Sequence, residues 1–224
     1  MDTLRSFLGG VGLGTYLLLK HKASNLDPLE PDAPLIFVFS PLVGSPLTTS
    51  AKFAVVCKSP LTERINDSLA SSSFAISGKK TGYDAIVITG KSESPTLLVI
   101  DEQSVSFRSA DNIWNSTCSQ TSARLTEEFG SQFKSAVIGP AGENLVRYAT
   151  ISHDGRHAGR GGSGAVMGSK KLKAVLVRGS KTTSWAQPES LVKYARQLSE
   201  KSTDQQPPSI GNWGLLQTCW FLID

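Results

Sequence analysis

The sequence contains little cysteine and has no long hydrophobic run. Its three cysteines, Cys57, Cys118 and Cys219, lie far apart and form no C-x-x-C pair, which excludes a disulfide framework and a cysteine metal site. We expect buried thiols in a reducing compartment. No stretch approaches the roughly 18 apolar residues that cross a membrane, and Leu17–Leu19 lack the pattern of a cleavable signal. The sequence therefore predicts a cytoplasmic protein without a membrane partner.

Acidic residues are absent from one segment near the end of the chain, although the whole chain is only weakly basic, with a net charge of +4. Between Gly155 and Thr182 all charged residues are basic: Arg156, Arg160, Lys170, Lys171, Lys173, Arg178 and Lys181. A local positive field favours a phosphorylated small molecule over nucleic acid, which needs a broader basic face. The length of 224 residues and the hydrophobic content of 39% are typical of one domain with an ordinary core.

Five glycines occur in residues 156–171, which predicts a loop that opens a short helix. Glycines let backbone N–H groups approach an anion, and a helix N-terminus adds the positive end of its dipole. Gly159, Gly161 and Gly164 also match the spacing of a dinucleotide fingerprint, which would indicate NADP. However, Ser152–Ala158 separate the glycines from the strand expected before them, and the crossover after them is too short. A structural turn with a solvated basic face is the other alternative.

Glu143 follows a Gly-Pro-Ala-Gly sequence and is a candidate catalytic carboxylate, although a capping or turn role fits the pattern better. The histidines His21, His153 and His157 lack a neighbouring carboxylate that would make a general base, and no Cys, His or Asp spacing resembles a metal site. We therefore expect structural histidines. Trp114 is expected to be a hydrophobic plug.

The hydrophobic pattern predicts short strands that alternate with helices. Expected strands are Leu35–Phe39, Lys52–Cys57, Tyr83–Ile88, Leu97–Ile100, Ser104–Arg108, Ala136–Ile138, Val146–Ile151 and Leu172–Val177. The first expected helical region is residues 3–21, interrupted by the glycine run 9–14. Further helices are expected between the small, polar segment Ser68–Ser73 and Lys80, at Thr121–Phe129, and directly after the glycine loop.

The order of these elements repeats once. The first half has a strand before Ser40-Pro41, the strand at Lys52, a small-residue segment, a helix and residues 85–90. The second half has the matching elements in the same order: a strand before Gly139-Pro140, Arg147–Ala149, the glycine segment, a helix and residues 174–179. Chance similarity explains this match equally well. If the repeat is real, two related halves face a shared site, and each offers one basic residue, Lys52 or Arg147, and one helix N-terminus.

Two ordered strings resemble the aldehyde ferredoxin oxidoreductase family. They are GPAGENLVR at residues 139–147 and AGRGGSGAVMGSKKLKA at residues 158–174, with further agreement at Phe7–Gly10, Gly12–Gly14, Tyr16–Lys20, Asp27–Leu29, Lys58–Thr62 and Gly82–Val87. The resemblance covers about residues 5–205 and lies within that family's N-terminal domain. It implies an α+β fold, a duplicated two-sheet domain with short helices. Such a domain holds a tungsten- or molybdenum-bispterin cofactor with magnesium between its halves.

Carried over by motif, the resemblance implies cofactor contacts in two segments and at one basic residue. The contacts are Lys52; Leu69, Ala70 and Ser71; and Arg156, His157, Gly159, Arg160 and Gly161, with the His157 backbone carbonyl as a magnesium ligand. Guanidinium forks bind phosphate better than an ammonium does, and Lys52 stands where the family usually has arginine. The family's Asn-Ser-Gly-Gly is Leu69-Ala70-Ser71-Ser72 here, so the amide expected beside magnesium is missing. His157 replaces a small residue, and no catalytic residue is expected.

The resemblance also implies a boundary within the chain. Residues 1–208 are expected to form the cofactor-binding domain, whereas residues 209–224 become abruptly apolar and are expected to be a non-native tail. The family oxidises aldehydes to carboxylic acids and passes electrons through a 4Fe-4S cluster to ferredoxin, yet no cysteine cluster motif occurs in this sequence. We therefore expect a truncated chain that is inactive alone. The alternatives are a pterin-binding or docking module for a separately encoded catalytic partner, with or without homodimerisation, and an NADP-binding protein.

Overall fold

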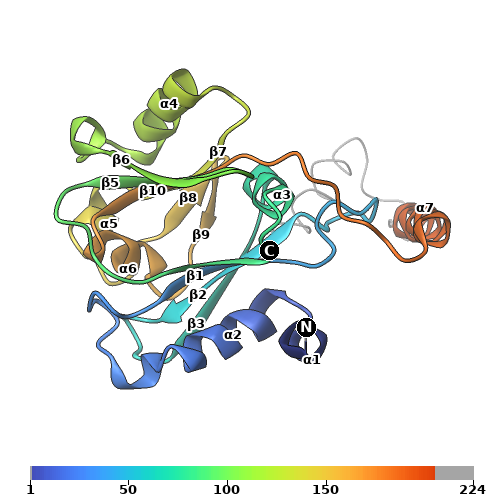
Figure 1. Ribbon diagram of the computed structural model, residues 1–224, viewed down its shortest axis with the longest axis horizontal. Helices are drawn as coiled ribbons and strands as arrows, with labels where there is room; N and C mark the ends of the chain where they lie inside the picture. Colours follow the sequence, from blue (N-terminus) through green and yellow to red (C-terminus); the bar gives the residue numbers. More distant parts are fainter. Residues whose placement is uncertain (1, 205–224) are drawn as a thin grey trace.

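The computed structural model describes residues 2–204, which form two β-sheets with α-helices between and around them (Figure 1). The helices are α1 Asp2–Phe7, α2 Gly10–Lys20, α3 Ser73–Lys80, α4 Cys118–Phe129, α5 Pro140–Glu143, α6 Ser163–Ser169 and α7 Pro188–Asp204, with 3₁₀ turns η1 Ala23–Asn25 and η2 Asp111–Ile113. The predicted tail at 209–224 lies outside the described residues, so the boundary at residue 208 stays a prediction.

Sheet A has four strands and sheet B has six. Sheet A has the order β3-β2-β1-β4, with β1 Leu35–Phe39, β2 Lys52–Lys58, β3 Ile65–Ser71 and β4 Ala85–Ile88. Sheet B has the order β6-β5-β10-β7-β8-β9, with β5 Thr96–Ile100, β6 Val105–Ser109, β7 Lys134–Val137, β8 Ile151–His153, β9 Arg156–Ala158 and β10 Leu172–Val177. The expected α+β fold with two sheets and short helices is confirmed.

Sheet A and four strands of sheet B have the same topology. In sheet A, β1 pairs with β2 and β4, and β2 pairs with β3, always antiparallel. In sheet B, β7 pairs with β8 and β10, and β8 pairs with β9, again always antiparallel. Helix α3 follows β3 and precedes β4, as α6 follows β9 and precedes β10. The predicted duplication is confirmed, and residues 85–88 align with residues 174–177 in this register, as predicted.

The two basic residues that were predicted to correspond, Lys52 and Arg147, do not. Lys52 begins β2 and lies opposite Ser71 of β3. When β7 and β8 are superimposed on β1 and β2 by their pairing, the counterpart of Lys52 is Thr150, the residue before β8. Arg147 lies in the turns after α5, because the strand predicted at Val146–Ile151 begins only at Ile151. The prediction matched residue types rather than strand positions and was wrong here.

The halves pack face to face, with α3 and α6 between the sheets (Figure 1). Helix α3 of the first half contacts β7 and β10, and α6 of the second half contacts β1 and β2. The interior between the sheets is a single apolar cluster centred on four aromatic rings: Phe37, Phe39, Phe53 and Phe74. Helix α2 covers the outer face of sheet A, and α4 covers that of sheet B. Because the helix of each half packs against the sheet of the other half, the two halves form one core.

Polar and glycine-rich segments depart from their predicted structure. The glycine run at 9–14 lies mostly inside α2, which begins after a break at Leu8 and Gly9, rather than interrupting a helix. The small, polar segment that begins at Ser68 continues the edge strand β3, and the first residues of the predicted glycine loop form β9. Edge strands with one side in solvent need no apolar alternation, so the hydrophobic pattern did not detect them.

Candidate functional site

The two halves meet where the edge strands β3 and β9 lie side by side, and we call residues 66–74 and 154–161 the β3–β9 junction. Side chains join the strands: Arg160 N–H donates to Ser68 Oγ (3.1 Å), Asn66 Nδ2 to the Arg160 carbonyl (3.1 Å), Arg156 Nη1 to the Ser71 carbonyl (3.1 Å), and Ser73 Oγ and Phe74 N–H to the Asp154 carboxylate. In these pairs, the residue number increases along β3 as the residue number of the partner decreases along β9. The strands therefore run antiparallel.

The junction has an approximate twofold axis through its centre. In the register of the repeat, Leu69 and Ala70 of β3 are equivalent to His157 and Ala158 of β9. The cross-strand contacts place these two pairs at the middle of the junction. Leu69 and His157 are exposed, whereas both alanines are buried. The two segments that the resemblance implied as cofactor contacts thus occupy the same position in each half.

The junction offers polar groups that the described residues leave unused. Arg160 is exposed, and its hydrogen bonds to other described residues use only its backbone. Ser71 Oγ is buried and has no hydrogen-bond partner within residues 2–204. Lys52 lies opposite Ser71, and exposed His157 places Nδ1 3.4 Å from Thr150 Oγ1. The junction therefore offers an exposed guanidinium and a hydroxyl without a partner in the described residues, with Lys52 on the neighbouring strand β2, and such groups suit an anionic ligand.

The predicted contact residues all lie in the junction or directly beside it: Lys52, Leu69, Ala70, Ser71, Arg156, His157, Gly159, Arg160 and Gly161. Sequence reasoning missed Asn66, Ser68 and Asp154, which tie one strand to the other. Aligning the repeat by strand register would have indicated them, because it brings β3 and β9 into equivalent edge positions.

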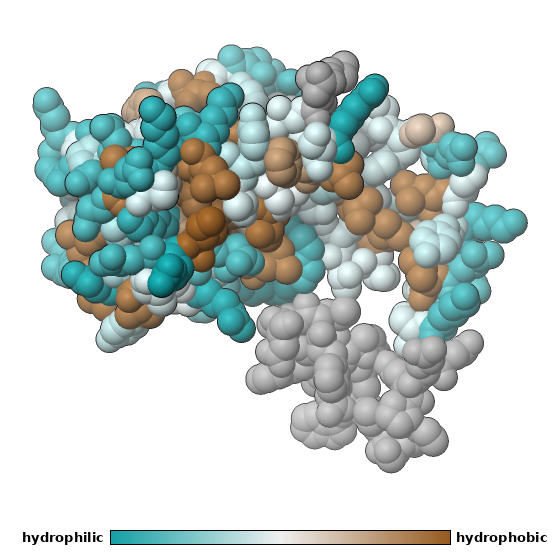
Figure 2. Space-filling model, turned by 90° about the horizontal axis from the view of Figure 1, so that it is seen from below, coloured by the Kyte–Doolittle hydropathy of each residue, from teal (hydrophilic) through white to brown (hydrophobic). Residues whose placement is uncertain are grey.

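The surface around the junction is mixed in polarity. Figure 2 views the molecule from the side on which α2 lies in Figure 1, and hydrophobic areas lie between hydrophilic ones on that face too. Exposed apolar side chains at the junction and beside it include Ile65, Leu69 and Tyr148, and Leu69 is 59% exposed. The junction is therefore not only basic, since its centre carries an apolar side chain in the first half.

Helix α6 does not present its N-terminus to solvent, contrary to the expected anion-binding helix end. All residues of α6 are buried, and the Gly164 N–H donates to the Ala149 carbonyl at 2.9 Å. A Cβ at Gly162 would lie 1.9 Å from the Arg147 carbonyl oxygen. The glycines therefore let backbone segments pack closely, and an anion would meet the residues before α6 rather than its N-terminus.

The predicted cluster of positive charge is smaller in space than in sequence. Lys170 is buried, its Nζ donates to the Pro31 carbonyl at 2.7 Å, and burial lowers its pKa to about 8. Arg178 pairs with Asp101 at 3.2 Å, and its guanidinium lies 4.7 Å from the centre of the Phe133 ring. Of the seven basic residues, only Arg156, Arg160 and Lys181 are exposed, and the two arginines lie in the junction.

Glu143 is neither a turn cap nor an exposed catalytic carboxylate. Its side chain is 1% exposed and forms an ion pair with Lys173, whose side chain is 0% exposed. The Asn115 N–H donates to Glu143 Oε2 at 2.9 Å, and Lys173 Nζ donates to the Ser116 carbonyl at 2.8 Å. Trp114, predicted as a hydrophobic plug, has its ring centre 6.0 Å from Lys173 Nζ. This buried network connects α5, β10 and the loop before α4.

His153 is a structural histidine, as expected, but an unusual one. It is 1% exposed, packs its ring edge-on against Phe53 at 4.9 Å, and neither ring nitrogen has a hydrogen-bond partner within the described residues. Burial lowers its pKa from 6.5 to about 4, although Asp154 opposes this shift. The folded protein therefore holds His153 neutral between these two pH values, where the unfolded chain binds a proton.

The pKa of His153 is lower in the folded protein than in the unfolded chain. The free energy of unfolding therefore decreases as the pH falls from about 6.5 towards 4. Between pH 7 and pH 5 the loss from this residue is about 2 kcal/mol. We expect His153→Leu to reduce the acid-induced loss of unfolding free energy by that amount in urea titrations at both pH values. The Leu69→Ala variant changes an exposed junction side chain that cannot titrate, so it is the control and should keep the wild-type pH dependence. Equal pH dependence in all three proteins would show that His153 is protonated in the fold.

The cysteines in the described residues are unpaired. Cys57 is buried, and desolvation raises the pKa of its thiol to about 12, whereas Cys118 is half-buried. Residues 2–204 contain no group of three or more His, Cys, Asp or Glu side chains that could hold a metal ion. In the same part of the chain, no helix has the length and apolar character required to cross a membrane.

The dinucleotide alternative fails on the topology of sheet B, in agreement with the short crossover after the glycines. Strand β9 ends directly before Gly159, so a strand does precede the glycines, contrary to our expectation. However, β8 and β7 separate β9 from β10, and three successive antiparallel pairs make β9 and β10 antiparallel. A dinucleotide fingerprint requires an adjacent parallel strand after the helix. The glycine segment is therefore not a dinucleotide site.

These features define a duplicated, two-sheet α+β domain with a basic junction between its halves. The sequence matches the family described as "Aldehyde ferredoxin oxidoreductase, N-terminal domain" over residues 1–179, so the chain belongs to this family, as the motifs predicted. A "Tungsten-containing aldehyde ferredoxin oxidoreductase" from Pyrococcus furiosus is 45% identical over 202 residues. That alignment covers 89% of this chain and 33% of the relative.

Two further proteins are similar to this chain over most of its length. The protein of the same name from Thermococcus kodakarensis is 43% identical, over 89% of this chain and 33% of its own length. A solved structure, "Active site complex BamBC of Benzoyl Coenzyme A reductase in complex with 1,5 Dienoyl-CoA", has a TM-score of 0.88 and 32% identity, and covers 94% of this chain and 33% of that one. The chain thus spans about a third of the length of these proteins.

Proposed function

We propose that the β3–β9 junction binds the phosphate groups of a tungsten- or molybdenum-bispterin cofactor, with magnesium at the His157 carbonyl. The observation that supports this most is the approximate twofold axis, which relates Leu69–Ser71 to His157–Gly159. A cofactor with two similar pterin halves has the same symmetry. The name "tungsten-containing" carried by relatives favours tungsten as the metal.

The side chains of the junction fit phosphate oxygens. The Arg160 guanidinium has no partner among residues 2–204 and can bind two oxygens at once. Arg156 is oriented by its bond to the Ser71 carbonyl, and its other N–H groups have no partner in the same part of the chain. Lys52 adds a positive charge from β2 beside Ser71, whose buried Oγ lacks a partner among the described residues. These groups would hold and orient the cofactor. When bound, its metal would exchange two electrons with an aldehyde.

The first half is the weaker half of the proposed site. Leu69 offers no polar side chain at the position where the second half has His157. Lys52 is a point charge rather than a planar fork, so it binds phosphate less directionally than arginine does. We therefore propose that the second half, with Arg156 and Arg160, contributes most of the binding free energy.

For the assembled enzyme we propose oxidation of an aldehyde to a carboxylic acid in the cytoplasm, with ferredoxin as electron acceptor and a 4Fe-4S cluster between them. This sequence has only three cysteines and no cluster motif, so cluster ligands and catalytic residues would come from outside it. We propose that the chain alone binds the cofactor without turnover. The alternative is a module that carries the cofactor to, or docks on, a separately encoded catalytic partner. In this alternative the chain acts as a monomer or a homodimer and binds the cofactor at the same junction.

Arg160→Ala tests the cofactor site. Loss of a charge-assisted bidentate contact is expected to reduce bound pterin per protein at least about tenfold. Pterin would be measured as its fluorescent oxidation product, and tungsten, molybdenum and magnesium by mass spectrometry, after native anaerobic purification. Arg108→Ala is the control, because exposed Arg108 lies on β6, at the opposite edge of sheet B from β9.

Equal pterin in both variants would mean that the junction is only structural. Wild-type protein without pterin or metal would contradict cofactor binding by this chain. Stoichiometric pterin without aldehyde oxidation supports the binding or carrier role, whereas efficient oxidation by the purified chain would contradict the proposal that it is inactive alone.

A further inference from the structure

The outer face of the β3–β9 junction follows from the alternation of side chains along its strands. Ala70 of β3 and Ala158 of β9 belong to the apolar core between the sheets. Neighbouring side chains of a strand point to opposite faces, so Leu69 and His157 point away from this core, and both are exposed. Because β3 and β9 lie side by side, these two equivalent side chains lie on one outer surface.

The inner strand of each half adds one polar side chain to the same face. Lys52 begins β2 opposite Ser71, two residues after Leu69 on β3, so Lys52 lies on the face of Leu69. Diagonal neighbours of this kind are within reach of a long side chain. The counterpart of Lys52 in the second half is Thr150, directly before β8, which lies in the same diagonal relation to His157.

The second half shows this diagonal contact directly. Thr150 Oγ1 lies 3.4 Å from His157 Nδ1. A neutral imidazole has one donor and one acceptor nitrogen, and the hydrogen bond at one nitrogen decides which is which. When the threonine hydroxyl donates to Nδ1, the ring carries its proton on Nε2, which has no partner among the described residues. The contact therefore selects the tautomer that offers a donor to a ligand.

The two halves hold the same kinds of group on exchanged strands. In the first half the nitrogen is on the inner strand, at Lys52, and the hydroxyl is on the edge strand, at Ser71. In the second half the hydroxyl comes from Thr150 beside the inner strand, and the nitrogen is on the edge strand, at His157. The counterpart of Ser71 is Gly159, which has no side chain. Each half therefore offers one nitrogen donor and one hydroxyl.

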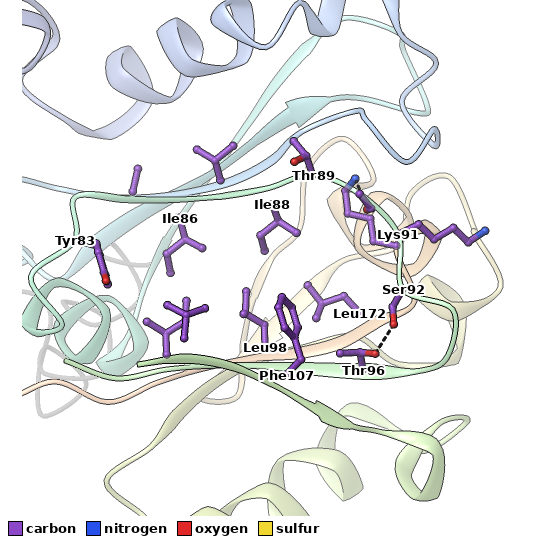
Figure 3. A pocket seen from close by; sticks show the side chains of 16 residues that line it. Tyr83, Ile86, Ile88, Thr89, Lys91, Ser92, Thr96, Leu98, Phe107 and Leu172 are labelled. Carbon is purple, nitrogen blue, oxygen red and sulfur yellow. Dashed lines mark hydrogen bonds between the residues drawn. The ribbon is translucent and has the colours of Figure 1, made fainter. Parts of the chain in front are cut away.

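A cleft elsewhere in the domain shows the contrast. It measures about 670 Å³ and lies between β4 and strands β5, β6 and β10 (Figure 3). Of its polar side chains, Ser92 bonds to Thr96 at 2.7 Å, and Lys170 Nζ donates to backbone carbonyls. The remaining walls are mainly aliphatic and aromatic. The paired donors that suit a phosphate lie at the junction instead.

We propose that His157 binds a phosphate oxygen of the cofactor through Nε2, and that Thr150 is the positioning residue that holds its ring. The imidazole takes the place in the second half that the Lys52 ammonium takes in the first. This role rests on the proposed cofactor site, where His157 would otherwise contribute only its backbone carbonyl. It assigns a function to Thr150 and to the imidazole, both on the outer face of the junction.

Three variants of the full-length protein test the imidazole. His157→Phe keeps a ring without nitrogen, so bound pterin per protein should fall about fivefold or more after native anaerobic purification. His157→Gln keeps a donor near the position of Nε2 and should retain pterin within about twofold of wild type. Lys52→Met removes the equivalent donor of the first half and should match His157→Phe.

Thr150→Val tests the positioning, because valine keeps the branched shape and removes the hydroxyl. Bound pterin should fall about threefold, with no further loss in the His157→Phe background, since the hydroxyl acts only through the ring. In protein without cofactor, two-bond ¹H–¹⁵N correlation spectra should show the Nε2–H tautomer of His157 in wild type and a shift towards Nδ1–H in Thr150→Val. A side chain that only fills space would leave the tautomer unchanged.

The outcomes separate this role from the cofactor site itself. If Arg160→Ala loses pterin while His157→Phe retains it, the site stands and the role of His157 is wrong. Losses that add in the double variant would contradict positioning by Thr150. If wild type carries no pterin, the proposed function is wrong, and inorganic phosphate becomes the probe. A saturable shift of the His157 ring signals that weakens in Thr150→Val would then keep the phosphate contact, and its absence would overturn it.

Discussion

Replacing Glu143 with glutamine is expected to lower the free energy of unfolding by about 3–5 kcal/mol, because the Lys173 ammonium would remain buried without its counter-ion. Glutamine preserves the shape of the side chain, so packing hardly changes. The ammonium would keep only the Ser116 carbonyl at 2.8 Å and neutral contacts. Burial of an ion is costly unless it is paired, so the loss should appear as a lower urea midpoint with an unchanged slope.

A double-mutant cycle separates the ion pair from general damage. Lys173→Met in the Glu143→Gln background removes the unpaired charge and keeps an unbranched side chain of similar length. We expect this double variant to recover most of the lost free energy and to unfold closer to wild type than either single variant does. If Glu143→Gln lost less than about 1 kcal/mol, water would have to reach the pair in solution.

The same network shows why charge could not be placed from the sequence. Lys173 counts as one of seven basic residues in an acid-free segment, yet its partner Glu143 lies 30 residues earlier and meets it only in the fold. Lys170 is likewise removed from the surface by backbone carbonyls of distant residues. A linear charge pattern therefore overstated the local field, because long-range contacts decide which charges face solvent.

The duplication, in contrast, could be predicted because it is present in strand patterns. The apolar strands β1, β4, β7 and β10 are central or follow helices, and their short apolar runs are clear enough to be recognised. The edge strands β3 and β9 carry polar and small residues, so they were read as loops. The approximate symmetry of Leu69–Ser71 and His157–Gly159 was hidden for the same reason, since the two segments share only one residue type.

Gly168→Ala is expected to destabilise the protein by about 3 kcal/mol or more, because its new Cβ would lie 1.9 Å from the Gly142 carbonyl oxygen and 2.6 Å from its carbon. These atoms belong to the backbone of α5, so no side chain can rotate away. Relief requires α5 to move relative to α6, and α5 carries Glu143. The measurement is the free energy of unfolding in urea at neutral pH.

Gly12→Ala is the matched control, because Gly12 also lies inside a helix but is exposed on α2. Its new Cβ would meet only the Phe7 carbonyl oxygen, at 3.3 Å, which a small shift at the end of α1 relieves. Alanine favours helix over glycine, so Gly12→Ala should change stability by no more than about 1 kcal/mol in either direction. Similar losses in both variants would mean that helix geometry, rather than close packing of α5 on α6, decides the effect. A large loss only at Gly168 would show that glycines of the basic segment serve backbone packing, which leaves anion binding to the exposed arginines before α6.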